Sequence, residues 1–218
     1  MTMKSDKQLK QDIETELMWD PAVNSAQIGV SVDNAAVSLL GTVDTFAQKW
    51  AAEDATKRVS GVRAVAQDLT VKLLGVHERS DTELASATLD ALKWNVAIPS
   101  SVTAKVEKGH VTLEGNVAWY YQRAAAVQAV RCLTGVIEVH NNITLAPQVS
   151  VTQVKEKVQA ALQRQASTDA NAIHIEAAGG TVTLTGHASS FHALHDATMA
   201  AWTAPGVTEV VDRMTMSI

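Results

Sequence analysis

Four histidines in the last third of the sequence form the densest group of side chains that could do chemistry. They are His174, His187, His192 and His195. Imidazole is a common ligand for zinc and copper, so such a group raises the question of a metal site. However, His192 and His195 lack a partnering acidic motif, and His174 alternates with Ile173 and Ile175 as on a strand. We therefore interpret these histidines as a solvated polar face and predict no metal ion and no cofactor.

A nucleophilic or acid–base enzyme would need Cys132 or a serine beside a base, or a pair of carboxylates. Cys132 is the single cysteine and lies beside an apolar helix position, Leu133, so burial is its expected state. The pair Glu53-Asp54 is typical of an exposed helix surface. The chain contains no Gly-x-Ser-x-Gly, Walker-type or dinucleotide-binding motif. Without an assembled set of catalytic groups, we predict that the protein is not an enzyme.

Six glycines recur at a fixed spacing and could in principle form loops that approach a ligand closely. They make three equally spaced pairs, Gly41 with Gly61, Gly115 with Gly135 and Gly186 with Gly206. The first of each pair closes the motif Val-x-Leu-x-Gly. Because the backbone freedom of glycine accounts for the repetition, we interpret all six as structural. The first is predicted to mark the end of a strand and the second the end of a helix.

The glycine pairs divide the chain into three repeats, residues 1–74, 75–147 and 148–218. Each repeat begins with a serine cap (Ser5, Ser80 or Ser150). The residues 4, 8 and 12 positions later form one helical stripe and are apolar except for Thr88. Two alternating strands follow, joined by turns at Asp33-Asn34, Lys108-Gly109 and Gly179-Gly180. An alanine-rich helix and a last strand complete the repeat. We predict an α+β fold of three tandem αββαβ repeats, each a small three-stranded sheet with two helices on one face.

Four aromatic residues are the candidates for binding, because they are not explained by the repeated core. Trp50 and Trp202 fall about 160° and 140° away from the alanine stripe of their helices. Trp119 and Tyr121 flank Tyr120, the position where the other two repeats carry phenylalanine. Aromatic side chains are favoured at interfaces. Trp50, Trp119, Tyr121 and Trp202 are therefore predicted to contact a partner or lipid, with packing between repeats as the alternative.

The charge of the chain argues against several classes of partner. The net charge is −5 and no repeat is basic, so binding to nucleic acid by bulk electrostatics is not expected. No apolar run approaches the length of a membrane span. The N-terminus has no apolar core of a secretory signal, so we expect a cytoplasmic location, or a periplasmic one if a leader has been removed.

The motifs resemble those of the BON domain, a family named for bacterial OsmY and nodulation proteins. The best match is in the second repeat, with Val111-Thr-Leu-Glu-Gly-Asn-Val117 and the stretch from Gly135 to Leu145. The first and third repeats depart from it, with Asp68 and Arg213 where the second has Asn142. The resemblance covers nearly the whole chain as three tandem copies. It implies an αββαβ fold, a binding role without catalysis, and no catalytic residues.

The expected function follows from this resemblance. BON domains occur in osmotic-stress proteins, secretins and mechanosensitive channels, and attachment to phospholipid surfaces has been proposed for them. We therefore expect a non-catalytic interaction protein, linked to bacterial osmotic or envelope stress, that engages a protein partner or a membrane surface. Direct binding of a phospholipid or a small hydrophobic ligand is the alternative.

Overall fold

The computed structural model of the protein describes residues 4–146, 154–164 and 172–216. These residues include three three-stranded sheets, one in each predicted repeat. Contacts within the chain group it into two compact units, residues 1–115 with 124–142 and residues 116–123 with 143–218.

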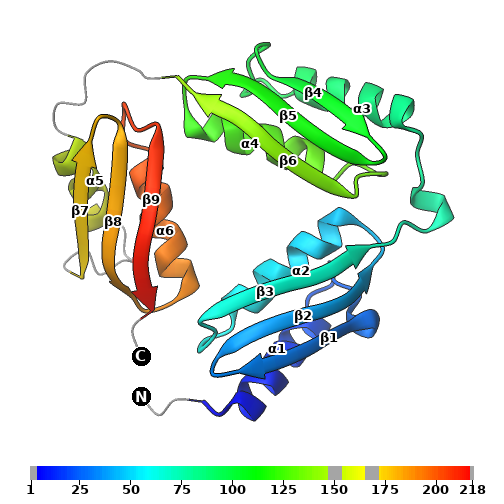
Figure 1. Ribbon diagram of the computed structural model, residues 1–218, viewed down its shortest axis with the longest axis horizontal. Helices are drawn as coiled ribbons and strands as arrows, with labels where there is room; N and C mark the ends of the chain where they lie inside the picture. Colours follow the sequence, from blue (N-terminus) through cyan, green and yellow to red (C-terminus); the bar gives the residue numbers. More distant parts are fainter. Residues whose placement is uncertain (1–3, 147–153, 165–171, 217–218) are drawn as a thin grey trace. The chain divides into compact units, whose positions relative to one another are not determined.

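The first repeat has the predicted order of helix, two strands, helix and strand, with one added turn of 3₁₀ helix. Its elements are α1 (Asp6–Trp19), η1 (Ser25–Gln27), β1 (Ile28–Asp33), β2 (Ala36–Val43), α2 (Phe46–Arg58) and β3 (Ala64–Val71). Strand β2 lies in the middle of the sheet, antiparallel to β1 and parallel to β3. Both helices lie on one face of the sheet (Figure 1).

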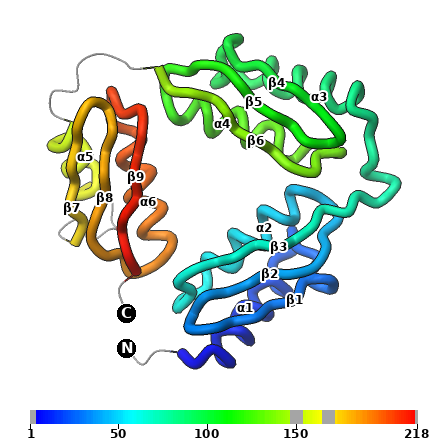
Figure 2. The backbone as a smooth tube through the Cα atoms, viewed as in Figure 1, coloured from blue at the N-terminus to red at the C-terminus, as the bar shows by residue number. Residues whose placement is uncertain are grey.

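The second and third repeats follow the same order. The second contains η2 (Gly75–His77), α3 (Asp81–Trp94), β4 (Thr103–Glu107), β5 (His110–Val117), α4 (Tyr120–Arg131) and β6 (Glu138–Leu145). The third contains α5 (Val154–Arg164), β7 (Ile173–Ala178), β8 (Thr181–Ala188), α6 (Phe191–Trp202) and β9 (Glu209–Met216). In each sheet the second strand of the repeat is central, as the path of the chain in Figure 2 shows. The predicted fold class is confirmed.

The first helix of a repeat begins at the predicted serine. The Ser5 side chain accepts a hydrogen bond from the backbone N–H of Gln8. Ser80 and Glu83 form a complete capping box, in which each side chain binds the other residue's backbone N–H. Such caps satisfy N–H groups that the first turn of a helix leaves without partners. Ser150, the corresponding residue of the third repeat, lies outside the described residues.

The core of each repeat lies between the helices and the sheet, where the residues of the predicted helical stripes are buried. The buried stripes of the first helices are Leu9, Ile13 and Leu17; Leu84, Thr88 and Leu92; and Val154, Val158 and Leu162. On the second helices, Ala52, Ala126 and Ala197 are fully buried. Alanine at these positions lets the helix approach the sheet closely. The other face of each sheet carries mainly polar and charged residues.

The predicted first turn is displaced by one residue. It is formed by Asn34 and Ala35, both with positive φ, rather than by Asp33 and Asn34. The Asp6 carboxylate at the start of α1 accepts hydrogen bonds from the N–H groups of Asn34 (2.9 Å) and Ala35 (3.0 Å). Those bonds hold a backbone conformation that alanine rarely adopts. The local sequence indicates a turn but not its exact position, because the carboxylate that holds it belongs to a different element.

Asp81 holds the turn of the second repeat in the same way. Its carboxylate accepts hydrogen bonds from the N–H groups of Lys108 (2.7 Å) and Gly109 (3.0 Å). The bonds from Gly109 and Lys108 lower the pKa of the Asp81 carboxyl. One side chain therefore joins the start of α3 to the turn between β4 and β5.

Replacing Asp81 by asparagine should destabilise the protein, because the amide lacks the charge that strengthens both hydrogen bonds. A lowered folded pKa means that the stabilisation is complete above the pKa of the unfolded chain, about 3.9, and is lost as the pH falls through the folded pKa. Urea unfolding midpoints of the native chain and Asp81→Asn should therefore differ at pH 7 and converge as the pH falls below about 4. Asp90→Asn, at an exposed position of the same helix, is the control and should leave the midpoint unchanged. A difference that persists unchanged in acid would contradict this account.

The first glycines of the three pairs leave no room for a side chain, which agrees with a structural role, but their predicted place at the end of a strand is wrong. Gly41, Gly115 and Gly186 do not end the second strands, which continue beyond them to Val43, Val117 and Ala188. Gly115 lies inside β5 with φ of 136°, and a Cβ built on it would lie 2.3 Å from the carbonyl oxygen of Ser101. The glycine is required because the backbone that precedes β4 occupies the space of a side chain.

Gly115→Ala should therefore lower the free energy of unfolding by at least about 2 kcal/mol, since both the positive φ and the close carbonyl oppose a side chain. Gly75→Ala provides the matched control, because a Cβ at Gly75 meets no atom within 4 Å. That control should stay within about 0.5 kcal/mol of the native chain. Chemical denaturation of the two variants measures both quantities, and equal effects would show that the close approach is unimportant.

Candidate functional site

The predicted candidate Trp50 lies on the outer side of α2 and is 43% exposed. The guanidinium carbon of Arg131 lies 3.8 Å from the centroid of its ring, which is the geometry of a cation–π contact. Both residues belong to the same compact unit. The indole therefore has a neighbour within the chain, and contact with an external partner stays a prediction.

Trp202, the last residue of α6, is half-buried. Its ring stacks on that of Tyr120, with centroids 4.6 Å apart and an angle of 15° between the planes. The Arg123 guanidinium lies 4.9 Å from the Tyr120 ring and 4.8 Å from the Trp202 ring. These three residues also lie within one compact unit. Trp202 therefore packs against Tyr120 within the chain, as the alternative of packing between repeats predicts. A contact of Trp202 with an external partner or lipid stays a prediction.

Trp119 and Tyr121 lie at the start of α4. Trp119 is half-buried and Tyr121 is exposed. The side-chain oxygen of Gln122 accepts hydrogen bonds from the N–H groups of Ala118 (3.0 Å) and Trp119 (3.1 Å) and so caps the helix. The two candidate aromatics therefore flank a defined helix start rather than a loose loop.

Two tryptophans that the sequence analysis did not single out are the most exposed in the described chain. Trp19 is the last residue of α1 and Trp94 is the last residue of α3, and they are 83% and 85% exposed. Neighbouring apolar side chains enlarge each site, with Met18 beside Trp19 and Val96 close to Trp94. The corresponding end of α5 carries Arg164 instead. The exposed indoles are thus a feature of the first two repeats.

A short repeated motif could have revealed these residues. Trp19-Asp20-Pro-Ala and Trp94-Asn95-Val-Ala occupy the same place in their repeats, each at the end of the helix that a serine cap begins. In both, the Asp20 or Asn95 side chain accepts a hydrogen bond from the N–H two positions later, at 3.0 Å. These local bonds turn the chain at once after the tryptophan. Each indole is therefore presented at a sharply ended helix.

An ionic cluster anchors the end of α1 that carries Trp19. Arg58 of α2 binds the carboxylates of Glu16 (3.1 Å) and Asp20 (2.8 Å), and also that of Asp54 on its own helix (3.0 Å). The hydrogen bond from Arg58, followed by that from the N–H of Ala22, lowers the pKa of Asp20. Exposed ion pairs contribute little singly, but a network of this kind restrains the helix end. The Trp19 side chain is thus exposed on a fixed backbone.

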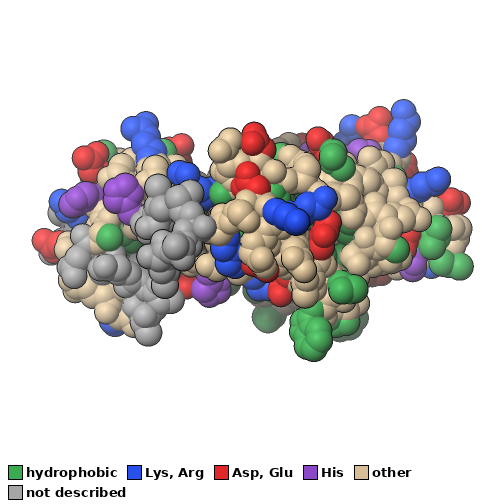
Figure 3. Space-filling view, turned by 90° about the horizontal axis from the view of Figure 1, so that it is seen from below, with side chains coloured by type: hydrophobic (Ala, Val, Ile, Leu, Met, Phe, Trp, Pro, Cys, Tyr) green, Lys and Arg blue, Asp and Glu red, His purple; other side chains and the backbone are tan. Residues whose placement is uncertain are grey.

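One face of the molecule carries charged side chains of both signs. On the face drawn in Figure 3, acidic and basic side chains are interspersed, and hydrophobic side chains occur in small separate groups. Glu53 pairs with Lys57 and Asp54 with Arg58 on α2, as expected for an exposed helix surface. On this face the hydrophobic groups are therefore better candidates for binding than a patch of one charge.

Two histidines of the third repeat have separate partners, and Asp196 is an acidic partner of His192 that the sequence analysis did not expect. His187 Nδ1 lies 2.7 Å from the hydroxyl of Thr215, and His192 Nε2 lies 3.6 Å from the Asp196 carboxylate. In the described part of the chain, the side chains that could jointly hold a metal are instead those of His110, Glu138 and His140. Cys132 is exposed and not buried as expected, because it follows the end of α4.

The different exposure of the tryptophans can be measured in solution. Acrylamide should quench the fluorescence of Trp19 and Trp94 readily, because their rings project into water, while Trp50, Trp119 and Trp202 are more shielded. In the double variant Trp19→Phe/Trp94→Phe, the remaining emission should lie at shorter wavelength and have a clearly smaller quenching constant than in the native chain. A Trp50→Phe/Trp202→Phe variant serves as the control and should become more quenchable on average. The reverse order would contradict the placement of the exposed rings.

Among the described residues, no helix has the length and apolar character needed to cross a membrane.

Comparison with known families gives a match across the chain. The sequence model of the BON domain matches residues 5–72, 80–147 and 150–217. No curated protein sequence matches the chain.

Two solved structures show a weak likeness. One is CdsD, a structural protein of the type III secretion system of Chlamydia trachomatis, at 15% identity over 96% of this chain and 92% of that chain, with a TM-score of 0.28. The other is the C-terminal domain of CdsD, at 14% identity over 99% of this chain and 100% of that chain, with a TM-score of 0.27. With TM-scores this low, the likeness carries no argument about function.

Proposed function

Because the chain belongs to the BON domain family, as three tandem copies, we propose that it is a non-catalytic binding protein that docks on a protein partner or a membrane surface through projecting aromatic side chains. The family supports a binding role without catalysis. The setting in bacterial osmotic or envelope stress and the cytoplasmic location belong to the same proposal and rest on the expectations from the sequence.

The observation that carries the proposal is the pair Trp19 and Trp94. Leaving an indole largely in water forgoes the free energy of burying about 200 Å² of mostly apolar surface, roughly 5 kcal/mol at 25 cal/mol per Å². Neither ring is needed for the core of its repeat, since the buried stripes end at Leu17 and Leu92. Tryptophan is among the residues that contribute most to binding when a partner covers them. Burial of these two rings against a partner is therefore the simplest explanation of their exposure.

The fixed backbone below the rings favours this use. The turns at Asp20 and Asn95 and the Arg58 cluster hold the helix ends in place before any partner arrives. Side chains held on ordered elements lose less conformational entropy on binding. The four aromatics Trp50, Trp119, Tyr121 and Trp202 remain proposed secondary contacts.

Direct binding of lipid is the second candidate, and the same two tryptophans favour it. Indole rings are enriched where proteins meet the interface of a bilayer. With a net charge of −5, insertion of the rings would drive attachment, and attraction to anionic headgroups would contribute little. An enclosed hydrophobic ligand is less well supported, because the pockets of about 290 and 310 Å³ are lined mainly by charged and polar side chains.

Sedimentation with vesicles tests the membrane form of the proposal. The native chain should sediment with zwitterionic and anionic phosphatidyl lipids to a similar extent, because the rings and not the charge are the anchors. The double variant Trp19→Ala/Trp94→Ala should lose most of this binding, at least about tenfold in affinity, since burial of two indoles is removed. Trp50→Ala and Trp119→Ala, at the proposed secondary contacts, should each weaken binding less than the double variant does. Leu40→Ala, which shortens an exposed apolar side chain outside these sites, is the control and should bind within about threefold of the native chain.

The protein form of the proposal is tested with the same variants. If no vesicle sediments the native chain, binding to lipid is rejected, and the native chain and the double variant are compared in affinity capture from osmotically stressed cells. A partner retained by the native chain and lost by Trp19→Ala/Trp94→Ala would support docking. If every captured protein and every vesicle binds both chains equally, the proposed use of the two tryptophans is wrong.

A further inference from the structure

Three potential metal ligands meet on the outer face of the second sheet. His110 is the first residue of β5, Glu138 is the first residue of β6, and His140 follows two positions later. Alternate residues of a strand share a face, so Glu138 and His140 point the same way. Val111, next to His110, is fully buried, which places His110 on the opposite face from the core. All three side chains therefore extend from the face that the helices leave uncovered.

The distances between the three side chains are close to those of a metal centre. His110 Nδ1 lies 3.2 Å and His140 Nε2 lies 3.5 Å from the same oxygen of Glu138. The potential ligand atoms all lie within 4.8 Å of one another. In a tetrahedral zinc site with bonds of about 2.0–2.1 Å, neighbouring ligand atoms are about 3.4 Å apart. Small rotations of exposed side chains would therefore bring the three atoms around one ion.

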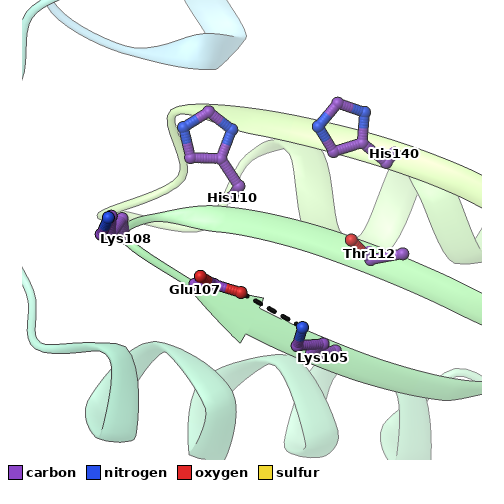
Figure 4. A pocket seen from close by; sticks show the side chains of 6 residues that line it. All are labelled: Lys105, Glu107, Lys108, His110, Thr112 and His140. Atoms are coloured by element: carbon purple, nitrogen blue, oxygen red, sulfur yellow. Dashed lines mark ion pairs between the residues drawn. The ribbon is translucent and has the colours of Figure 1, made fainter.

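The two imidazole rings are already arranged side by side. Their planes are 6° from parallel and their centroids are 6.0 Å apart. Figure 4 shows them on neighbouring strands above a pocket of about 290 Å³, which Lys105, Glu107, Lys108 and Thr112 also line. The three proposed ligands are 42–49% exposed, so an ion in solution can reach them without a change of fold. Water can complete the coordination on the open side.

The charged side chains around the three proposed ligands neither repel a cation nor attract it strongly. Lys105 is paired with Glu107 at 3.1 Å, and the charge of Lys108 acts on the carboxylate of Asp81. Two imidazoles and one carboxylate suit zinc, copper and nickel, whereas magnesium and calcium prefer a shell made of oxygen. From the donors and their spacing, we propose that His110, Glu138 and His140 bind one divalent transition-metal ion of the zinc class.

The other repeats supply an internal comparison. In the first sheet the same three positions are Ala36, Ala64 and Ala66, and Ala36 pairs with Ala64. In the third sheet they are Thr181, Glu209 and Val211, and the Thr181 hydroxyl donates a hydrogen bond to Glu209 at 2.9 Å. The fold thus does not need histidine there, because it is built on alanine, threonine and valine elsewhere. The proposed metal site is separate from the binding role proposed above. It also differs from the expectation that the protein holds no metal.

Calorimetric titration of the tag-free full chain with Zn²⁺ tests the proposal. We expect saturable binding of one ion per chain, and no binding of Mg²⁺. His110→Ala and His140→Ala should each weaken the affinity at least about tenfold, because even partners of metal ligands cost that much when removed. Glu138→Gln, which keeps the shape of the side chain, should weaken it as well. His192→Ala is the control, since it removes an exposed imidazole from α6 and should bind Zn²⁺ like the native chain.

A spectroscopic measurement identifies the ligands directly. The electron paramagnetic resonance spectrum of the Cu²⁺-loaded native chain should show two imidazole nitrogens, and that of His140→Ala should show one. Unchanged melting temperatures without metal would establish that the variants are folded. The proposal is overturned if the native chain does not bind Zn²⁺, if His140→Ala binds it as tightly as the native chain, or if His192→Ala weakens binding as much as His110→Ala. Vesicle binding by the native chain bears on none of these outcomes, so the two proposals can fail separately.

Discussion

In each repeat, a backbone carbonyl comes so close to a glycine of the central strand that any side chain would collide with it. A Cβ at Gly41, Gly115 or Gly186 would lie 2.0–2.3 Å from the carbonyl oxygen just before the first strand. The contact fixes the position at which the first two strands begin to pair. The second helix starts at the same interval after the glycine in every repeat, at Phe46, Tyr120 and Phe191. Placement of the alanine-rich helix on the sheet therefore depends on this single approach of backbone to backbone.

Interactions that are local in sequence could be predicted from the sequence. The side chains of Ser5 and Ser80 accept hydrogen bonds from N–H groups in the first turn of their own helices. The buried stripes of these helices follow from the helical period of their side chains. The role of Gly115 was harder to derive. Its motif is visible, but the reason for it is the position of Ser101, which only the folded sheet defines. The turn at Ala35 is a similar case, because the Asp6 carboxylate holds it from another element.

The candidate sites depend on what the repeats do not share, and this explains why the sequence revealed them poorly. Trp19 and Trp94 follow the last buried residue of their helices. The helical period of the buried stripe therefore does not predict whether their side chains are exposed. His110 and Glu138 are far apart in the sequence and meet because β5 and β6 run side by side (Figure 1). Histidines are more numerous in the third repeat, where the sequence predicts a solvated polar face and no metal. There, Thr215 and Asp196 provide His187 and His192 with unrelated partners.

The uncovered face of the three sheets has a consequence for how such a chain can evolve. Its side chains take no part in the packing of the helices, so duplicated copies are free to diverge there without loss of folding. Equivalent positions have become alanines in one copy, two imidazoles with a carboxylate in the next, and a threonine–glutamate pair in the last. Duplication thus supplies spare surfaces on which new chemistry can arise in one copy while its neighbours keep the original task.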